Sequence, residues 1–236
     1  MTVENIFKDN LLTKEQEEKL EALIRPRLPK EAAYDFPTVS EMRADKDHDN
    51  PIDVALQGLH ALISICGDDF RRDGLQETPF RVLKAFLEYT EGYGEDPKQH
   101  LLKDFEANVN GRDIVLIKDI PFNSMCEHHF APFFGTASIA YIPSNKIAGL
   151  SKFARTLDGY AKRFQVQEKL TTEVIDAIED VLQPIGSAVI INAEHYCMCG
   201  RGAHKRGATT TTSAVRGVFA ANASAKQELL SLLSMK

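Results

Sequence analysis

The order of strand-like and helix-like segments after residue 110 constrains the fold of this chain more than any other feature. Segments rich in β-branched residues alternate in pairs with segments whose apolar residues recur at helical spacing. The strand-like segments cover residues 113–120, 134–142, 188–197 and 209–219, and the helix-like ones cover 150–164, 166–182 and 224–233. Paired strands separated by paired helices predict an α+β fold, in which an antiparallel sheet carries the paired helices on one face.

The first 110 residues predict a helical extension. Thr13 and Gln16 have the spacing of a capping box for a short helix, whereas the rest of the first 50 residues has the charged, irregular character of a tail or linker. Pro51 and the pair Thr78-Pro79 suit the first turns of two more helices, and the first of these helices would bury Cys66. We therefore divide the chain into a partly helical tail, a helical region and a larger domain, at residues 1–50, 51–110 and 111–236.

Composition excludes several classes of protein. The formal net charge is −6, which argues against nucleic-acid binding because phosphate neutralisation needs clustered Lys and Arg. No apolar run is long enough to cross a bilayer, and the first residues do not form a secretory signal, so we expect no membrane partner. Four cysteines in 236 residues are too few for a disulfide scaffold. We expect a cytoplasmic protein with free or metal-bound thiols.

Two short segments are rich in metal-ligating side chains. The first is Cys126-Glu127-His128-His129, and the second is His195-Tyr196-Cys197-Met198-Cys199. Mixed Cys and His donors from two distant segments indicate a zinc site, because Zn²⁺ accepts both sulfur and imidazole ligands. The alternative for the first segment is a buried cysteine beside two surface histidines.

The spacing leaves more than one zinc site open. Cys126 and His129 would share one face of a helical turn, and either Cys197 or Cys199 could complete a catalytic site with three protein ligands. A structural site that uses both downstream cysteines is the alternative. Residues 188–197 are predicted to form a strand, so His195 and Cys197 should project together from one face. His128 and His195 could carry protons or could support the ligands from behind.

Polar residues elsewhere suggest a phosphorylated substrate. Lys152, Arg155 and Arg201 lie close in sequence to these segments and could bind phosphate, although a solvated helix face is the usual meaning of such charges. Arg81, in the first turn of a predicted helix, indicates either an anion contact or a surface arginine. The pair Gln167-Glu168 could bind the edge of a guanine base, or it could simply begin a helix.

Together these residues resemble the GTP cyclohydrolase I family over roughly residues 50–236. The resemblance rests on six ordered motifs: Glu77-Thr78-Pro79-Phe80-Arg81, Cys126-Glu127-His128-His129-Phe130, Gly149-Leu150-Ser151-Lys152-Phe153-Ala154-Arg155, Val166-Gln167-Glu168-Lys169-Leu170-Thr171, His195-Tyr196-Cys197, and Arg201-Gly202 with the threonines 209–212. The resemblance implies a zinc enzyme that opens the guanine ring of GTP at C8, releases formate and forms 7,8-dihydroneopterin triphosphate, the first step of pterin and folate biosynthesis. It also implies the tunnelling fold and a homodecamer of two pentameric rings with active sites between subunits.

The resemblance assigns roles by position. Zinc ligands are implied at Cys126, His129 and Cys197, and proton-transfer groups at His128 and His195. Ser151 is implied to act in the later rearrangement. Gln167 and Glu168 are implied to bind the guanine base. Lys152, Arg155, Arg201 and Arg81 are implied to hold the triphosphate. Glu127 and residues 1–50 receive no role.

The chain departs from the family pattern at one place, and two other functions are compatible with its residues. Cys199-Gly200 is an unusual pair of residues for the segment before Arg201. A second thiol there could compete for the metal or be oxidised. A related pterin or deazapurine enzyme of the same fold is one alternative function. A structural-zinc binding module without catalysis is the other.

Overall fold

The computed structural model describes residues 12–24, 51–102, 104–106 and 113–235, which divide into two compact units, Met1–Gly94 and Glu95–Lys236. The first unit contains helices α1 (Lys14–Ile24), α3 (Pro51–Ile65) and α4 (Thr78–Tyr89) and the 3-10 helix η3 (Glu91–Gly94). Thr13 and Gln16 form the predicted capping box, with backbone-to-side-chain distances of 2.7 and 3.3 Å. Most of the predicted tail at residues 1–50 lies outside the described residues. The three-part division of the chain stays a prediction.

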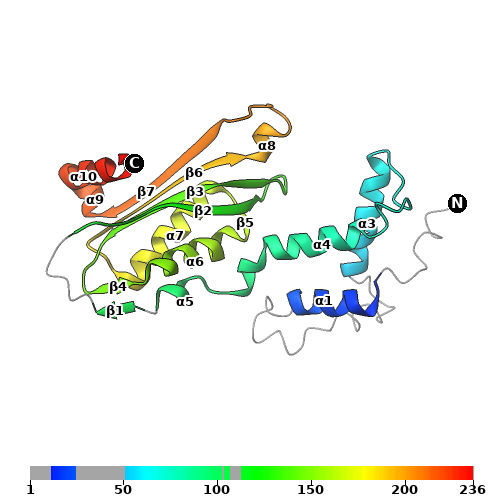
Figure 1. Ribbon diagram of the computed structural model, residues 1–236, viewed down its shortest axis with the longest axis horizontal. Coiled ribbons are helices and arrows are strands. Elements are labelled where there is room, and N and C mark those ends of the chain that lie inside the picture. The colour runs from blue at the N-terminus through cyan, green and yellow to red at the C-terminus, as the bar shows by residue number, and fades with distance from the viewer. Residues whose placement is uncertain (1–11, 25–50, 103, 107–112, 236) are drawn as a thin grey trace. The chain divides into compact units, whose positions relative to one another are not determined.

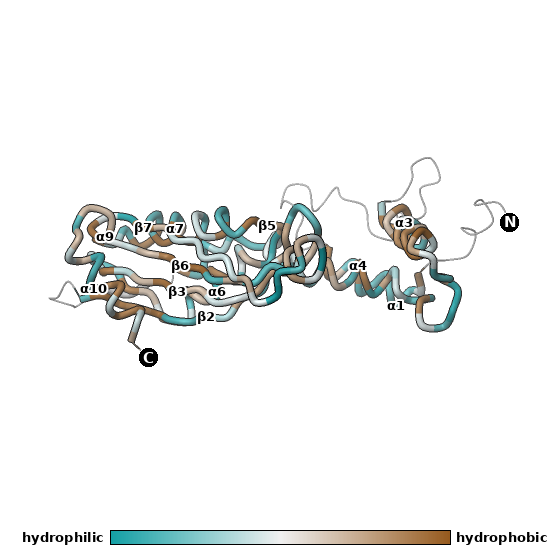
Figure 2. The backbone as a smooth tube through the Cα atoms, turned by 90° about the horizontal axis from the view of Figure 1, so that it is seen from above, coloured by the Kyte–Doolittle hydropathy of each residue, from teal (hydrophilic) through white to brown (hydrophobic). Residues whose placement is uncertain are grey.

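Helix α3 leaves much of its apolar surface uncovered within its own unit. Ile52 and Leu56 are buried in a small cluster with Leu20, but Ile65 is 82% exposed. Cys66, which was expected in the core, is exposed, so that expectation is wrong. The helix is coloured as hydrophobic along much of its length in Figure 2. Apolar periodicity predicted the helix correctly but not which part of its apolar face would be covered.

The second unit is built on a five-stranded sheet with the order β5-β2-β3-β6-β7 (Figure 1). Its strands are β2 (Val115–Cys126), β3 (Pro132–Ile142), β5 (Phe164–Gln165), β6 (Gly186–His195) and β7 (Thr209–Gly217). The three pairings of β2 with β3, β3 with β6, and β6 with β7 are antiparallel, as predicted. The two-residue strand β5 instead pairs in parallel with the end of β2. Two short strands, β1 (Asp104–Glu106) and β4 (Lys146–Ala148), form a separate antiparallel pair.

The predicted helix pair covers one face of the sheet (Figure 1). It consists of α6 (Leu150–Ala161) and α7 (Gln167–Leu182), while the short helix α5 (Lys98–Leu101) packs beside them. Phe153, Leu157 and Ile178 are fully buried against alternate residues of the strands, such as Ile139 and Val189. At roughly 25 cal/mol per Å² of buried apolar surface, this core is the main stabilising element of the unit.

The opposite face of the sheet is partly covered by the C-terminal helices. These are α9 (Val218–Ala221) and α10 (Ala223–Ser234). Phe219 and Leu229 pack against Ala140 and Ala188, which alternate along their strands with the residues that face α6 and α7. Asn222 caps α10, because its side chain accepts hydrogen bonds from the backbone N–H groups of Ser224 and Ala225.

The predicted strand at residues 188–197 ends two residues earlier than expected. Strand β6 ends at His195, and residues Tyr196–Cys199 form a single helical turn, α8. His195 and Cys197 are therefore not two residues of one strand face, and that prediction is wrong.

No helix within the described ranges is long and apolar enough to span a membrane.

Candidate metal centre and active site

The first ligand segment folds back on itself at the end of β2. The backbone N–H of Phe130 donates to the carbonyl of Cys126 at 2.9 Å, and the N–H of Cys126 donates to Ala131 at 2.9 Å. This single helical turn ends at Phe130, which adopts a left-handed conformation with φ of 50°. The turn returns His129 toward Cys126, so the predicted relation of these two side chains is observed.

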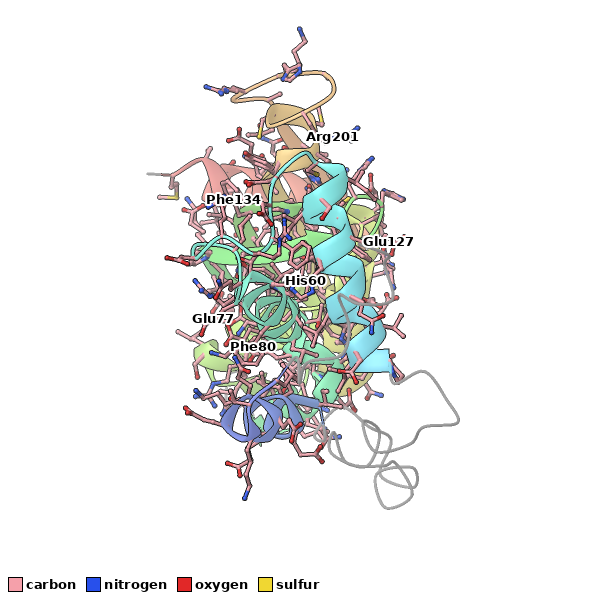
Figure 3. The ribbon with its side chains drawn as sticks, turned by 90° about the vertical axis from the view of Figure 1, so that its right-hand side faces the viewer. His60, Glu77, Phe80, Glu127, Phe134 and Arg201 are labelled. Carbon is pink, nitrogen blue, oxygen red and sulfur yellow. The ribbon has the colours of Figure 1, made fainter. Side chains whose placement is uncertain are left out.

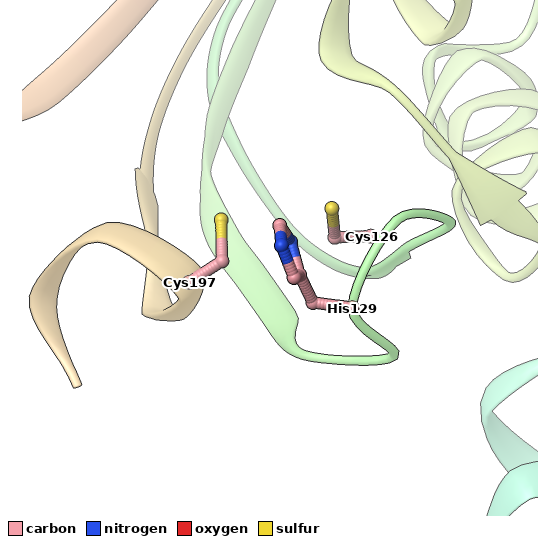
Figure 4. Close-up of side chains that lie close together, drawn as sticks. All are labelled: Cys126, His129 and Cys197. Carbon is pink, nitrogen blue, oxygen red and sulfur yellow. The ribbon is translucent and has the colours of Figure 1, made fainter. Parts of the chain in front are cut away.

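The second segment brings Cys197 to the same place. Strand β6 pairs with β3 so that His195 lies opposite Phe133, three residues after the end of the turn at Phe130. The helical turn α8 then carries Cys197 back toward the β2–β3 hairpin. The ligand atoms of Cys126, His129 and Cys197 all lie within 4.8 Å of one another (Figure 4).

The donors in this group suit a thiophilic divalent ion. Two thiolates and one imidazole match the ligand types of zinc, and three protein ligands leave one position for water or substrate. Burial, together with the neighbouring Cys126, raises the pKa of the Cys197 thiol. A bound cation would reverse this effect by stabilising both thiolates. Among the described residues Cys199 is not part of the group.

His128 and Glu127 lie on the outer side of the turn. The His128 side chain is 64% exposed, and its Nδ1 is 3.9 Å from the Cys126 sulfur. Its Nε2 is 4.0 Å from a carboxylate oxygen of Glu127. His128 is therefore accessible to a molecule bound over the metal group, and the Glu127 carboxylate lies beside its ring without a hydrogen bond to it.

The His195 ring is held by a hydrogen bond at its edge and by an aromatic stack on one face. Its Nε2 is 2.8 Å from Oε1 of Gln167, and its ring stacks on Phe133 with centroids 4.6 Å apart and planes 3° from parallel. Burial lowers the pKa of His195, and the negative charge of Glu168 opposes that shift. The neutral ring is thus favoured near neutral pH.

Two more predicted residues lie at this end of the sheet. Glu168 is exposed in the first turn of α7, directly after the buried Gln167. Arg201 is exposed just after α8, close enough to Cys197 for its charge to lower that thiol's pKa. Figure 3 labels Arg201 next to α8.

Ser151 and Lys152, which were predicted for the site, lie away from this group within the second unit. The C-terminal end of α6 lies here, because Ser124 donates to the carbonyl of Ala161 at 2.6 Å. Ser151 precedes Ala161 by ten residues, which places it about 15 Å away along the helix. Lys152 shares that end of α6, and Arg155 lies midway along the helix. Arg81 lies on α4 in the first unit, where it pairs with Glu77 at 3.0 Å.

Two threonines of β7, to which no role was assigned from the sequence, contact this site. Thr210 and Thr212 face inward, and the carbonyl of the first and the hydroxyl of the second accept hydrogen bonds from Gln167 at 2.9 and 3.1 Å. Thr171 on α7 joins them through a 2.7 Å contact with Thr212. The alternation of residues 209–212 on a strand was the available signal.

Comparisons with known proteins agree on one family. The family model described as GTP cyclohydrolase I matches residues 56–234. Proteins named "GTP cyclohydrolase 1" from Bacillus cytotoxicus and Bacillus anthracis are each 49% identical over 179 residues, covering 75% of this chain and 94% of theirs. A crystal structure of the archaeosine synthase QueF-Like aligns over 46% of this chain and 97% of its own, at 18% identity and a TM-score of 0.37, which is too low to support an argument. The chain belongs to the GTP cyclohydrolase I family.

Proposed function

We propose that this protein is a zinc-dependent GTP cyclohydrolase I. The reaction hydrolyses the imidazole ring of guanine at C8, releases formate, and rearranges and closes the remainder to 7,8-dihydroneopterin triphosphate. Family membership supports this activity, and the observation that carries it is the convergence of Cys126, His129 and Cys197 within 4.8 Å. These residues would hold the metal through two sulfur atoms and one ring nitrogen.

The roles of the surrounding residues follow from their exposure and chemistry. A bound zinc ion supplies a nucleophile at neutral pH by lowering the pKa of water to about 7. His128 and His195 flank the metal group and would move protons between solvent, substrate and leaving groups. The exposed Glu168 carboxylate can accept two hydrogen bonds from a guanine edge, and Arg201 can pair with phosphate oxygens. The family pattern adds Gln167 to the base contacts.

The active site is proposed to be shared between subunits. Ser151 and Lys152 lie at the far end of α6 from the metal group of the same chain, so a neighbouring chain would supply them together with Arg155. Arg81 would likewise contribute to triphosphate binding. This arrangement accords with a homodecamer of two pentamers of the tunnelling fold. A location in the cytoplasm fits the four free cysteines.

The direct test is to incubate the zinc-loaded protein with GTP. We expect formate and, after oxidation, a fluorescent pterin. A fully zinc-loaded protein that releases neither product from GTP would refute the proposal. Identifying the pterin by mass also separates this reaction from that of a related pterin or deazapurine enzyme.

A structural-zinc module without catalysis is the second candidate. Replacement of Cys197 by Ser separates the two functions. A structural site should unfold with this change, whereas a catalytic site should lose metal and activity and keep most of its helix and sheet signal. The three-donor group supports the catalytic site, because structural zinc sites usually have four protein ligands.

A further inference from the structure

The side chain of Gln167 is fully engaged inside the protein. Gln167 is 1% exposed at the first position of α7. Its amide nitrogen lies 3.0 Å from the Ile191 carbonyl, 2.9 Å from the Thr210 carbonyl and 3.1 Å from the Thr212 hydroxyl. A primary amide has two N–H bonds, so no donor of Gln167 is left for a ligand.

These contacts also decide which end of the amide faces His195. Turning the amide over would place its oxygen against the carbonyl oxygens of Ile191 and Thr210, and neither of them can donate a hydrogen bond. Oε1 must therefore face the imidazole, where it lies 2.8 Å from Nε2. Because an amide oxygen only accepts, the His195 ring donates to it through Nε2–H.

The plane of the His195 ring is fixed by a second contact. Phe133 is completely buried and lies directly opposite His195 in the pairing of β3 with β6. The two rings are 3° from parallel with centroids 4.6 Å apart. Rotation of the imidazole would break both this stack and the hydrogen bond to Gln167.

We propose that Gln167 is a positioning residue that fixes the plane and the orientation of the His195 ring beside the metal group. Of the pair Gln167-Glu168, only the exposed Glu168 then contacts the base. This differs from the role that the family pattern gives Gln167. It rests on the proposed cyclohydrolase function, in which His195 transfers protons. The inward-facing threonines Thr210 and Thr212 serve this site by fixing the amide.

The test compares steady-state formate release from GTP by the wild-type protein and by Gln167→Leu, which keeps the size of the side chain and removes its hydrogen bonds. We expect kcat to fall about 10- to 100-fold while KM stays within about threefold. Glu168→Gln should instead raise KM. If Gln167→Leu raises KM about tenfold or more and leaves kcat unchanged, Gln167 binds the base and the proposal is wrong.

A milder pair of variants covers the case in which Gln167→Leu does not fold. Thr212→Val removes one acceptor of the amide, whereas Thr211→Val alters the neighbouring exposed threonine on the other face of β7. We expect kcat to fall about 3- to 10-fold in the first variant and to stay unchanged in the second. Equal kcat values in the two variants would overturn the proposal.

A crystal structure of the most affected variant that folds provides a readout that does not depend on turnover. We expect the His195 ring to leave the plane of Phe133 or to occupy two orientations. An unmoved ring would contradict the positioning role. A wild-type protein that releases no formate would contradict the proposed function instead, so the two failures are distinguishable.

Discussion

Two cysteines on the single turn α8 have different surroundings. Cys197 lies in the metal group, whereas Cys199 is 8% exposed and lies near the negatively charged Glu194 carboxylate. Burial and that carboxylate raise the pKa of Cys199, which disfavours the thiolate needed both for metal binding and for oxidation. The unusual Cys199 in the family motif is thus a buried side chain rather than a competing ligand.

This difference predicts the result of replacing each cysteine with serine. We expect Cys199→Ser to keep its bound zinc and at least about a third of the wild-type activity, because Cys199 is not part of the metal group and serine is close to it in size. Cys197→Ser should lose most of its metal and at least about 99% of the activity, because it removes one of three ligands. Metal analysis of the purified proteins provides the measurement. Equal zinc loss in both variants would show that Cys199 is a ligand.

His60 on α3 predicts a dependence of stability on pH. Its Nδ1 is buried and finds no hydrogen-bond partner in the described part of the chain, and its ring lies 4.8 Å from that of Phe70. Burial lowers the pKa of His60 from its ordinary value of 6.5. The unfolded chain therefore binds a proton at a higher pH than the folded one, and stability falls as the pH drops through 6.5.

We expect the melting midpoint to decrease between pH 7.5 and pH 5.5, and His60→Leu to make that decrease smaller. Leucine keeps an apolar contact with Phe70 but cannot be protonated. Scanning calorimetry of both proteins across this range measures the difference. Identical slopes in the two proteins would mean that His60 does not contribute to the pH dependence.

At the scale of elements, the pairing of β3 with β6 depends on one glycine. A Cβ atom at Gly135 would lie 1.9 Å from the Asn192 carbonyl oxygen and 2.6 Å from the Cα atom of Ala193. Both are backbone atoms of the paired strand and cannot move aside without breaking the register. That register places His195 opposite Phe133 and so helps to assemble the site.

Gly135→Ala is therefore expected to destabilise the protein by at least about 2 kcal/mol or to prevent soluble expression. Gly58→Ala is the matched control, since a Cβ atom there meets nothing within 4 Å and the residue lies inside α3. That change should stabilise the protein by about 0.5–1 kcal/mol through helix propensity. Thermal denaturation of both variants measures the two effects. A neutral Gly135→Ala variant would contradict the observed strand register.

Element types were predictable where the pattern was long. The helices α6 and α7 and the strands β3 and β7 have enough residues for periodicity to identify them. The turn α8 has only four residues and the parallel strand β5 only two, so neither repeats often enough to leave a pattern. Cys66 was wrongly predicted to be buried, because periodicity identifies an apolar face of a helix but not which other residues cover that face.

The site was predictable in its ligand types and not in its assembly. Cys126, His129 and Cys197 stood out by chemistry, and the resemblance selected among the cysteines. Their meeting depends on the pairing of Phe133 with His195, a tertiary register that no local pattern encodes. The hydrogen bonds of Gln167 join three separate elements, α7, β6 and β7, and were not predictable for the same reason.

At the scale of the whole molecule, one chain holds two separated halves of the predicted site. The metal group, His195, Glu168 and Arg201 lie where β2 ends, and Ser151 and Lys152 lie at the far end of α6. Strand β7 is also at an edge of the sheet, and within the described residues no strand pairs with its outer side. An uncovered edge of nine residues can pair with another chain. Both features favour sites that form between subunits.

Shared sites predict that two inactive variants will restore activity when they assemble together. Lys152→Glu would repel the triphosphate and Cys197→Ser would lose the metal, so each alone should be nearly inactive. If each site takes Cys197 from one chain and Lys152 from another, random co-assembly of equal amounts leaves about a quarter of the sites intact. Formate release from GTP by the co-expressed mixture should then approach about a quarter of the wild-type rate.

The matched control is a mixture of Cys126→Ser and Cys197→Ser. Both ligands belong to the metal group of a single chain, so no arrangement of these two variants rebuilds an intact group. That mixture should stay inactive while the Lys152→Glu mixture recovers. Failure of both mixtures, with hybrid oligomers demonstrated by native mass spectrometry, would mean that each chain completes its own site. The far end of α6 would then have to reach the metal group through a rearrangement of the second unit.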